Sequence, residues 1–132
     1  MQPARRQPDP PPPLHDLEAE VMAVVWQRED ITVRDVFETV NAQAPRQRAY
    51  TTFMTIMMRL ADKGLLERRR EGKTDIYHAL VSADEYAAAR ARAEVGALVE
   101  EFGDLALAQF AAAVAGLDSD RRATLERLAI DG

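Results

Sequence analysis

The stretch RAYTTFMTIMMRL, residues 48–60, decides how this 132-residue chain is interpreted. Its apolar residues recur at helical spacing, and Lys63 and Gly64 supply a basic last turn and a glycine stop, so we expect a helix from Ala49 to Lys63. With about 100° of rotation per residue, the stripe predicted to face the core consists of Tyr50, Phe53, Met54, Met57, Leu60 and Ala61. The opposite half of the helix carries Thr51, Thr52, Thr55, Arg59 and Asp62.

The three threonines on that polar face are unusual, because threonine lowers helix stability by roughly half a kcal/mol per residue relative to alanine. A helix face that meets only water is usually built from glutamate, lysine, glutamine or arginine. A threonine hydroxyl can bond to a phosphate, and its methyl group can contact the methyl group of thymine. We therefore interpret Thr51, Thr52 and Thr55 as a DNA-facing surface; the alternative is a solvated helix of accidental composition.

The charge distribution favours the DNA interpretation, although the whole chain has a formal net charge of −5. Residues 39–61 contain no aspartate or glutamate, and residues 46–78 contain eight Lys or Arg against four Asp or Glu, a local net charge of +4. Arg46 and Arg48 precede the helix, where a phosphate would meet both their charges and the amide groups of the helix N-terminus. Together with Arg59, they complete the predicted DNA contacts of this helix.

A β-hairpin is predicted to follow, because the runs LLERRR (residues 65–70) and KTDIYHAL (residues 73–80) flank Glu71 and Gly72. The register predicted from a two-residue turn pairs Leu66 with Tyr77 and Arg68 with Asp75. The predicted phosphate contacts of the hairpin are Arg69, Arg70 and Lys73. The alternative is that these charges only keep the strand edges soluble.

The segment LALAQFAAAVAGL, residues 105–117, is apolar on every side except at Gln109. Such a helix must be buried all round, and this short chain has too few other helices to cover it. A second copy of the chain would cover it through a two-fold interface; the alternative is a packed, monomeric three-helix appendage. The predicted interface residues are Val95, Leu98, Val99, Phe102, Leu105, Phe110, Val114 and Leu117.

These patterns divide the chain into three parts. Residues 1–13, MQPARRQPDPPPP, are expected to be a disordered proline-rich tail. Residues 14–81 are expected to form a winged helix-turn-helix DNA-binding domain, whose second helix opens with a capping box of Thr32 and Asp35. Residues 82–132 are expected to form a helical dimerisation region, opened by a second capping box of Ser82 and Glu85. The predicted fold class is therefore mostly α with a small β-hairpin wing.

Several classes of function are disfavoured by the composition. The chain has no cysteine, and neither His15 nor His78 stands in a metal-binding or catalytic spacing, so we expect no enzyme, no metal site and no cofactor. No apolar run is long enough to span a bilayer, so no membrane insertion is expected, and the lack of cysteine fits a cytoplasmic location. Two non-catalytic alternatives to DNA binding stay open: a winged-helix protein-interaction module and a ligand-sensing regulator.

Four segments resemble the penicillinase-repressor family of winged-helix transcriptional repressors. They are LHDLEAEVMAVVW (14–26), TVRDVFETVN (32–41), AYTTFMTIMMRLADKGLLERRREGK (49–73) and IYHALVSADEY (76–86). The resemblance implies a homodimer that represses a β-lactamase-type or related operon, and thereby antibiotic resistance, by binding a palindromic operator in double-stranded DNA. It also implies that the helix from Ala49 to Lys63 lies in the major groove. In several members a membrane-bound sensor metallopeptidase triggers release from DNA.

Overall fold

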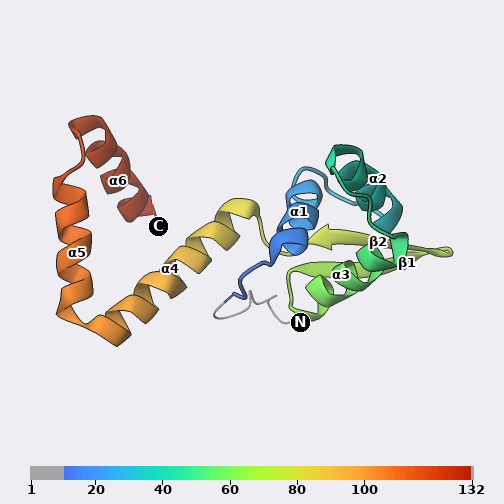
Figure 1. Ribbon diagram of the computed structural model, residues 1–132, viewed down its shortest axis with the longest axis horizontal. Helices are drawn as coiled ribbons and strands as arrows, with labels where there is room; N and C mark the ends of the chain where they lie inside the picture. Colours follow the sequence, from blue (N-terminus) through green and yellow to red (C-terminus); the bar gives the residue numbers. More distant parts are fainter. Residues whose placement is uncertain (1–10, 132) are drawn as a thin grey trace, which may run out of the picture. The chain divides into compact units, whose positions relative to one another are not determined.

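The computed structural model describes residues 11–131, as six helices and one two-stranded antiparallel hairpin (Figure 1). In chain order the elements are α1 (Asp16–Val25), α2 (Val33–Gln43), α3 (Tyr50–Asp62), β1 (Leu66–Glu71), β2 (Thr74–Ala79), α4 (Ala83–Phe102), α5 (Asp104–Ala115) and α6 (Ser119–Asp131). The predicted fold class, mostly α with a small hairpin wing, is confirmed. Residue contacts divide the chain into two units, Met1–Ala87 and Ala88–Gly132, and the boundary falls within α4.

The predicted tail, residues 1–13, lies mostly outside the described residues. Its last three residues are described, and Pro11 is buried. The hydroxyl group of Tyr86 donates a hydrogen bond to the carbonyl oxygen of Pro12. This contact joins Pro12 to the first turn of α4.

The first unit packs α1, α2 and α3 against the hairpin around one apolar core. Its fully buried side chains include Val21, Val36, Phe53, Leu65 and Tyr77. The predicted capping box at the start of α2 is confirmed: the amide of Thr32 donates to the Asp35 carboxylate, and the amide of Asp35 donates to the Thr32 hydroxyl, both at 3.1 Å. The box predicted at Ser82 and Glu85 is confirmed in the same way.

The register predicted for the hairpin is wrong by two residues. The structure pairs Leu66 with Ala79, Arg68 with Tyr77, and Arg70 with Asp75. Gly72 is the first residue of the two-residue turn rather than the second, and its φ of +62° is the conformation that glycine tolerates best. A shift of two residues leaves every side chain on the same face of its strand, so the alternation of the sequence could not distinguish the two registers.

A third, very short strand adds to the hairpin from the loop between α1 and α2. Ile31 pairs with Tyr77 through two backbone hydrogen bonds of 2.9 and 2.8 Å. Both side chains are buried, so this bridge fixes the hairpin to the end of α1.

The core stripe predicted for α3 is partly wrong. The buried residues of α3 are Phe53, Ile56, Met57 and Leu60. Met54, which was expected in the core, is 42% exposed, and Ile56, which was not assigned, is 6% exposed. The spacing i, i+3, i+4, i+7 from Phe53 is the ordinary pattern of a helix packed on one side. The middle of the buried face is therefore turned away from Tyr50, toward Ile56.

In the second unit, the apolar side chains of a single chain are largely exposed. Ala106 is the one buried residue among the described positions of this unit. Leu125 and Leu128 of α6 are 37% and 64% exposed.

Candidate nucleic-acid interface

Four of the nine side chains predicted to contact DNA lie on α3. Thr51, Thr55 and Arg59 are exposed, whereas Thr52 lies at the margin of the core and is half-buried. The hydroxyl group of Thr55 donates a hydrogen bond to the carbonyl oxygen of Thr51 at 3.1 Å. In this arrangement the hydroxyl can accept, but not donate, a hydrogen bond with a neighbouring molecule. This face thus presents short polar groups and a cation to the surroundings of the helix.

The turn before α3 is held by a residue that sequence reasoning missed. Asn41 is only 6% exposed, and its side-chain amide forms a pair of hydrogen bonds with the backbone of Arg48. Its Nδ2 donates to the Arg48 carbonyl oxygen at 2.9 Å, and its Oδ1 accepts from the Arg48 amide at 3.0 Å. The side chain of Gln47 donates to the carbonyl oxygen of Asn41 at 2.7 Å. We call these three bonds the Asn41 clamp.

The Asn41 clamp determines where the two arginines before α3 stand. Arg46 and Arg48 are exposed in the turn between Ala44 and Ala49, and the N-terminus of α3 follows directly. The Arg48 guanidinium lies 3.7 Å from the Glu20 carboxylate, an exposed pair that a phosphate could replace at small cost. Two cations therefore stand beside the N-terminus of α3, an arrangement that favours an anion.

Aromatic side chains set the position of α3 relative to α2. Phe37 contacts Tyr50 and Phe53 edge to face, with ring centroids 5.4 and 5.9 Å apart. The Arg34 guanidinium lies over the Tyr50 ring, 5.4 Å from its centre. Such pairs add to the burial of the rings, so the two helices of the helix-turn-helix are held in one arrangement.

The other end of α3 is anchored by a buried carboxylate. Glu18 on α1 is 3% exposed, and its Oε2 accepts a hydrogen bond from Lys63 Nζ at 2.8 Å. Its Oε1 accepts from the His15 amide at 3.1 Å. Burial by itself would raise the pKa of Glu18, but these hydrogen bonds and the charge of Lys63 outweigh burial and lower the pKa below 4.5. Glu18 is therefore ionised at neutral pH and ties α1 to the C-terminus of α3.

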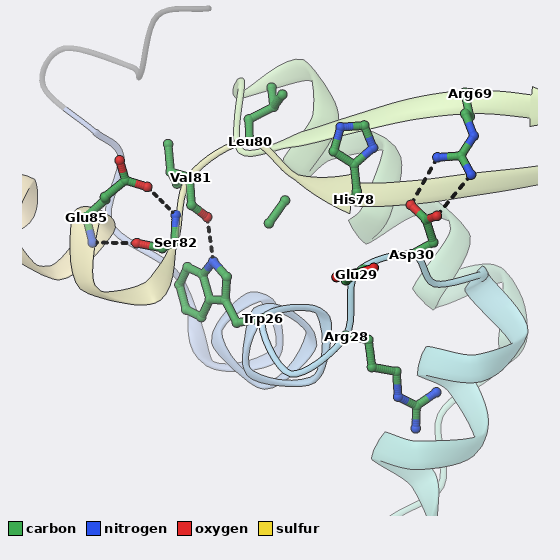
Figure 2. A pocket seen from close by; sticks show the side chains of 11 residues that line it. Trp26, Arg28, Glu29, Asp30, Arg69, His78, Leu80, Val81, Ser82 and Glu85 are labelled. Atoms are coloured by element: carbon green, nitrogen blue, oxygen red, sulfur yellow. Dashed lines mark hydrogen bonds and ion pairs between the residues drawn. The ribbon is translucent and has the colours of Figure 1, made fainter.

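The arginines of the hairpin point to different faces. Arg69 forms two hydrogen bonds of 3.0 Å with the Asp30 carboxylate, as Figure 2 shows, and a third contact of 3.4 Å with Glu71. Hydrogen bonding by Arg69 is the main reason that the pKa of Asp30 is lowered. Arg70, on the other face, lies 3.5 Å from Asp75 and is well exposed.

Two further cations of the hairpin complete the wing. Lys73 is exposed in the turn. Arg68 stands beside Tyr77, whose pKa is raised by burial and lowered in smaller part by the Arg68 guanidinium. Arg68 also lines a hollow of about 340 Å³ together with Met58 of α3. The wing therefore offers cations on the α3 side, including Arg68, which the sequence prediction did not select.

A hollow of about 590 Å³ lies where the end of α1, the end of β2 and the start of α4 meet (Figure 2). Trp26 closes one side: its Nε1 donates to the Val81 carbonyl oxygen at 2.9 Å, and its ring lies 5.7 Å from that of Tyr86. Arg69 of the hairpin bonds to Asp30 in the loop after α1. This pair and the bond from Trp26 to Val81 hold the hairpin and the segment before α4 to the end of α1.

The predicted dimerisation residues all lie on α4, α5 and the turn after α5. Val95, Leu98, Phe102, Leu105 and Val114 are exposed in the single chain, with Leu105 the most exposed at 70%. The remaining three, Val99, Phe110 and Leu117, are half-buried. An apolar hollow of about 240 Å³ is lined by Leu98, Phe102, Leu105, Ala106, Gln109 and Phe110.

Two negative observations apply to the described part of the chain, residues 11–131. Its His, Asp and Glu side chains form no group of three that could hold a metal ion. Each of its helices is too short or too polar to cross a lipid bilayer.

A helix-turn-helix followed by a hairpin wing, with a short third strand on the hairpin, defines a winged-helix protein of the class that binds DNA. The chain belongs to the penicillinase-repressor family, because residues 14–130 match the family model described as Penicillinase repressor. The family consists of transcriptional repressors and not of enzymes, as the sequence predicted.

Individual relatives agree with this assignment. The chain is 42% identical over 76 residues to the transcriptional regulator BlaI of Mycobacterium tuberculosis (strain CDC 1551 / Oshkosh), which covers 57% of this chain and 54% of that protein. It is 28% identical over 75 residues to the penicillinase repressor of Bacillus licheniformis, 57% of each chain. The chain thus spans about half the length of the curated relatives it matches.

A solved structure is similar to a large part of this chain. The solution structure of the DNA-binding domain of the repressor BlaI matches with a TM-score of 0.50 and 25% identity. The match covers 63% of this chain and 94% of that domain. The predicted winged-helix architecture is therefore confirmed.

Proposed function

We propose that this protein is a sequence-specific transcriptional repressor that binds double-stranded operator DNA as a homodimer. Its target is a palindromic site in a β-lactamase-type or related operon, and a sensor signal relieves repression. The observation that carries the DNA-binding proposal is the exposed face of α3, where Thr51, Thr55 and Arg59 stand beyond a turn that presents Arg46 and Arg48. No acidic residue occurs between Glu38 and Asp62, so this surface is complementary to a polyanion.

The contacts of α3 divide into two kinds. Arg46 and Arg48, beside the helix N-terminus, would neutralise phosphates and determine the orientation of the protein on the duplex. Thr51 and Thr55 would contact base edges in the major groove, with Arg59 beyond them on the same face. Thr52, which is half-buried, would contribute from the margin of that face.

The wing would add phosphate contacts on the side of the hairpin that faces α3. Arg70, Lys73 and Arg68 are placed for this role. Arg69 would have to give up its two hydrogen bonds to Asp30 before it could contact DNA. We therefore assign Arg69 to bracing the wing, and its predicted contact with DNA remains a separate, testable prediction.

Dimerisation is proposed from the apolar side chains that a single chain leaves uncovered. Phe102, Leu105 and Leu107 are each more than half exposed, and they lie within a few residues of one another around the start of α5. A second copy related by a two-fold axis could bury this surface and would place two α3 helices on half-sites about ten base pairs apart. An operator with inverted-repeat symmetry follows from such a dimer.

The regulatory setting is proposed from family membership. The family model is described as Penicillinase repressor, which supports a β-lactamase-type operon, an effect on antibiotic resistance and an action in the cytoplasm, where the DNA is. Relief through a membrane-bound sensor metallopeptidase is proposed on the same basis. It is tested by asking whether such a peptidase, when activated, abolishes operator binding by this chain.

The DNA-binding proposal is tested by the salt dependence of duplex affinity. Candidate sites are first enriched from a pool of random duplexes, and the dissociation constant of the best site is then measured at several salt concentrations. With five phosphate contacts per protomer from Arg46, Arg48, Arg68, Arg70 and Lys73, the affinity of a dimer should fall with a log–log slope of about −9. A flat response, or no enriched site, would instead support the protein-interaction module.

A further inference from the structure

Two methionines stand on the exposed face of α3. Met54 is 42% exposed and Met58 is 48% exposed. Residues four apart lie on the same side of a helix, about 6 Å apart along its axis. The two thioethers therefore form a short apolar strip, and Thr51 and Thr55 stand beside it on the same face.

The fold itself does not need these two side chains. The core side of α3 is complete with Phe53, Ile56, Met57 and Leu60, and Met57 is fully buried. A single exposed apolar residue is common on protein surfaces. Two of them on successive turns, beside threonines and within a segment that has no acidic residue, mark a surface that a binding partner covers.

The surroundings of the strip identify what covers it. Arg46 and Arg48 lie before the N-terminal end of α3, and beside its C-terminal half Met58 shares the wall of a hollow with Arg68 of the wing. Asp62 and Glu67 also line that hollow, so the cation at this end of the strip is the single side chain Arg68. An apolar strip with two arginines before the helix and one arginine beside its far end matches the major groove of a DNA duplex, in which phosphates border the bases. The apolar group that the groove presents there is the 5-methyl group of thymine.

We propose that Met54 and Met58 contact thymine methyl groups and so require thymine at defined positions of each operator half-site. This inference rests on the proposed DNA-binding function and adds the base that the helix selects. The methionine side chain suits this role, because it is unbranched and polarizable and adapts its shape to an apolar neighbour. The threonines beside it would supply polar contacts to the adjoining base edges.

The experiment removes the methyl group from the DNA and the thioether from the protein. In the duplex selected by the full-length protein, each thymine is replaced in turn by deoxyuridine, which differs only by the missing methyl group. Affinities are measured for the wild type and for Met54→Gln and Met58→Gln, because glutamine is unbranched and has similar helix propensity. Met54→Leu and Met58→Leu serve as conservative variants, and deoxyuridine outside the bound site serves as the DNA control.

For the wild type we expect one or two thymines per half-site at which deoxyuridine weakens binding about fourfold, equivalent to the ~0.8 kcal/mol of one buried methylene-sized group. Each glutamine variant should lose the sensitivity at its own thymine, and each leucine variant should keep it. The inference is overturned if no thymine is sensitive, or if the glutamine variants keep the same sensitivity while they still bind the duplex. Failure of the proposed function looks different, because then the wild type enriches no site at all.

Discussion

Asn41 holds the turn that presents Arg46 and Arg48, and its replacement by alanine should weaken both the fold and DNA binding. The side chain is almost fully buried and bonds to both backbone groups of Arg48. In Asn41→Ala these two hydrogen bonds are lost, and the Arg48 amide and carbonyl groups must find water instead. Asn41→Asp keeps one acceptor for the Arg48 amide but places a carboxylate against the Arg48 carbonyl oxygen.

The magnitude follows from the two bonds. Each contributes roughly 0.5–1.5 kcal/mol net, and water can reach part of the turn because Arg48 itself is exposed. We therefore expect Asn41→Ala to lower the free energy of unfolding by about 2 kcal/mol, which for a domain of this size lowers Tm by roughly 8–16 °C. The freed turn must also be ordered again on DNA, so operator affinity should fall about tenfold, or ~1.4 kcal/mol.

Urea denaturation and duplex titration measure the two effects. Gln43→Ala is the matched control, because it removes an exposed side-chain amide near the same end of α2 without touching Arg48. If Asn41→Ala and Gln43→Ala have the same free energy of unfolding and the same operator affinity, the Asn41 clamp does not organise the turn.

Three further predictions concern the anchor, the wing and the dimer. Because the pKa of Glu18 is lowered, its contribution to stability is fully present above pH 4.5 and is lost as the pH falls through the lowered value. Glu18→Gln should lower the free energy of unfolding by about 2 kcal/mol at neutral pH. Thermal melts of this variant should depend less on acid pH than those of the wild type. Arg70→Ala should make the salt slope of DNA binding shallower by about 0.9 per protomer. Arg69→Ala should leave the slope unchanged and lower Tm. A shallower slope for Arg69→Ala would show that Arg69 does contact phosphate. Leu105→Glu should halve the mass measured by light scattering. Thr124→Glu, which adds the same charge to an exposed position of α6, should leave the mass unchanged. An intact dimer in Leu105→Glu would show that the proposed interface is wrong.

Local signals in the sequence were sufficient for much of the fold. The capping boxes at Thr32 and Ser82 were predictable because both partners lie three residues apart and bond within one turn. The stop at Gly64 was predictable for a similar reason, since its φ of +83° is one that glycine adopts without strain. The four segments that resemble the family made the winged-helix architecture predictable.

Other features depend on contacts between distant parts of the chain. The hairpin register was ambiguous because Gly72 could occupy either position of a two-residue turn without changing the faces of the strands. The core side of α3 was predictable, since Ile56 completes the i, i+3, i+4, i+7 pattern that starts at Phe53. The prediction missed Ile56 because it took Tyr50 as the centre of the apolar face. The bonds of Asn41 to Arg48 and of Asp30 to Arg69 leave no local signal, because the turn and the wing bring the partners together only in the folded chain.

The central claim is that the exposed face of α3 contacts base edges, and one comparison of affinities tests it most directly. The affinity of the variant with alanine at Thr51, Thr52 and Thr55 is measured for the selected operator and for a random duplex of the same length. The account predicts a loss of about 1–3 kcal/mol per good base contact on the operator alone, with random-duplex affinity unchanged and Tm equal to that of the wild type or higher, because alanine favours the helix. An operator affinity equal to that of the wild type would contradict it.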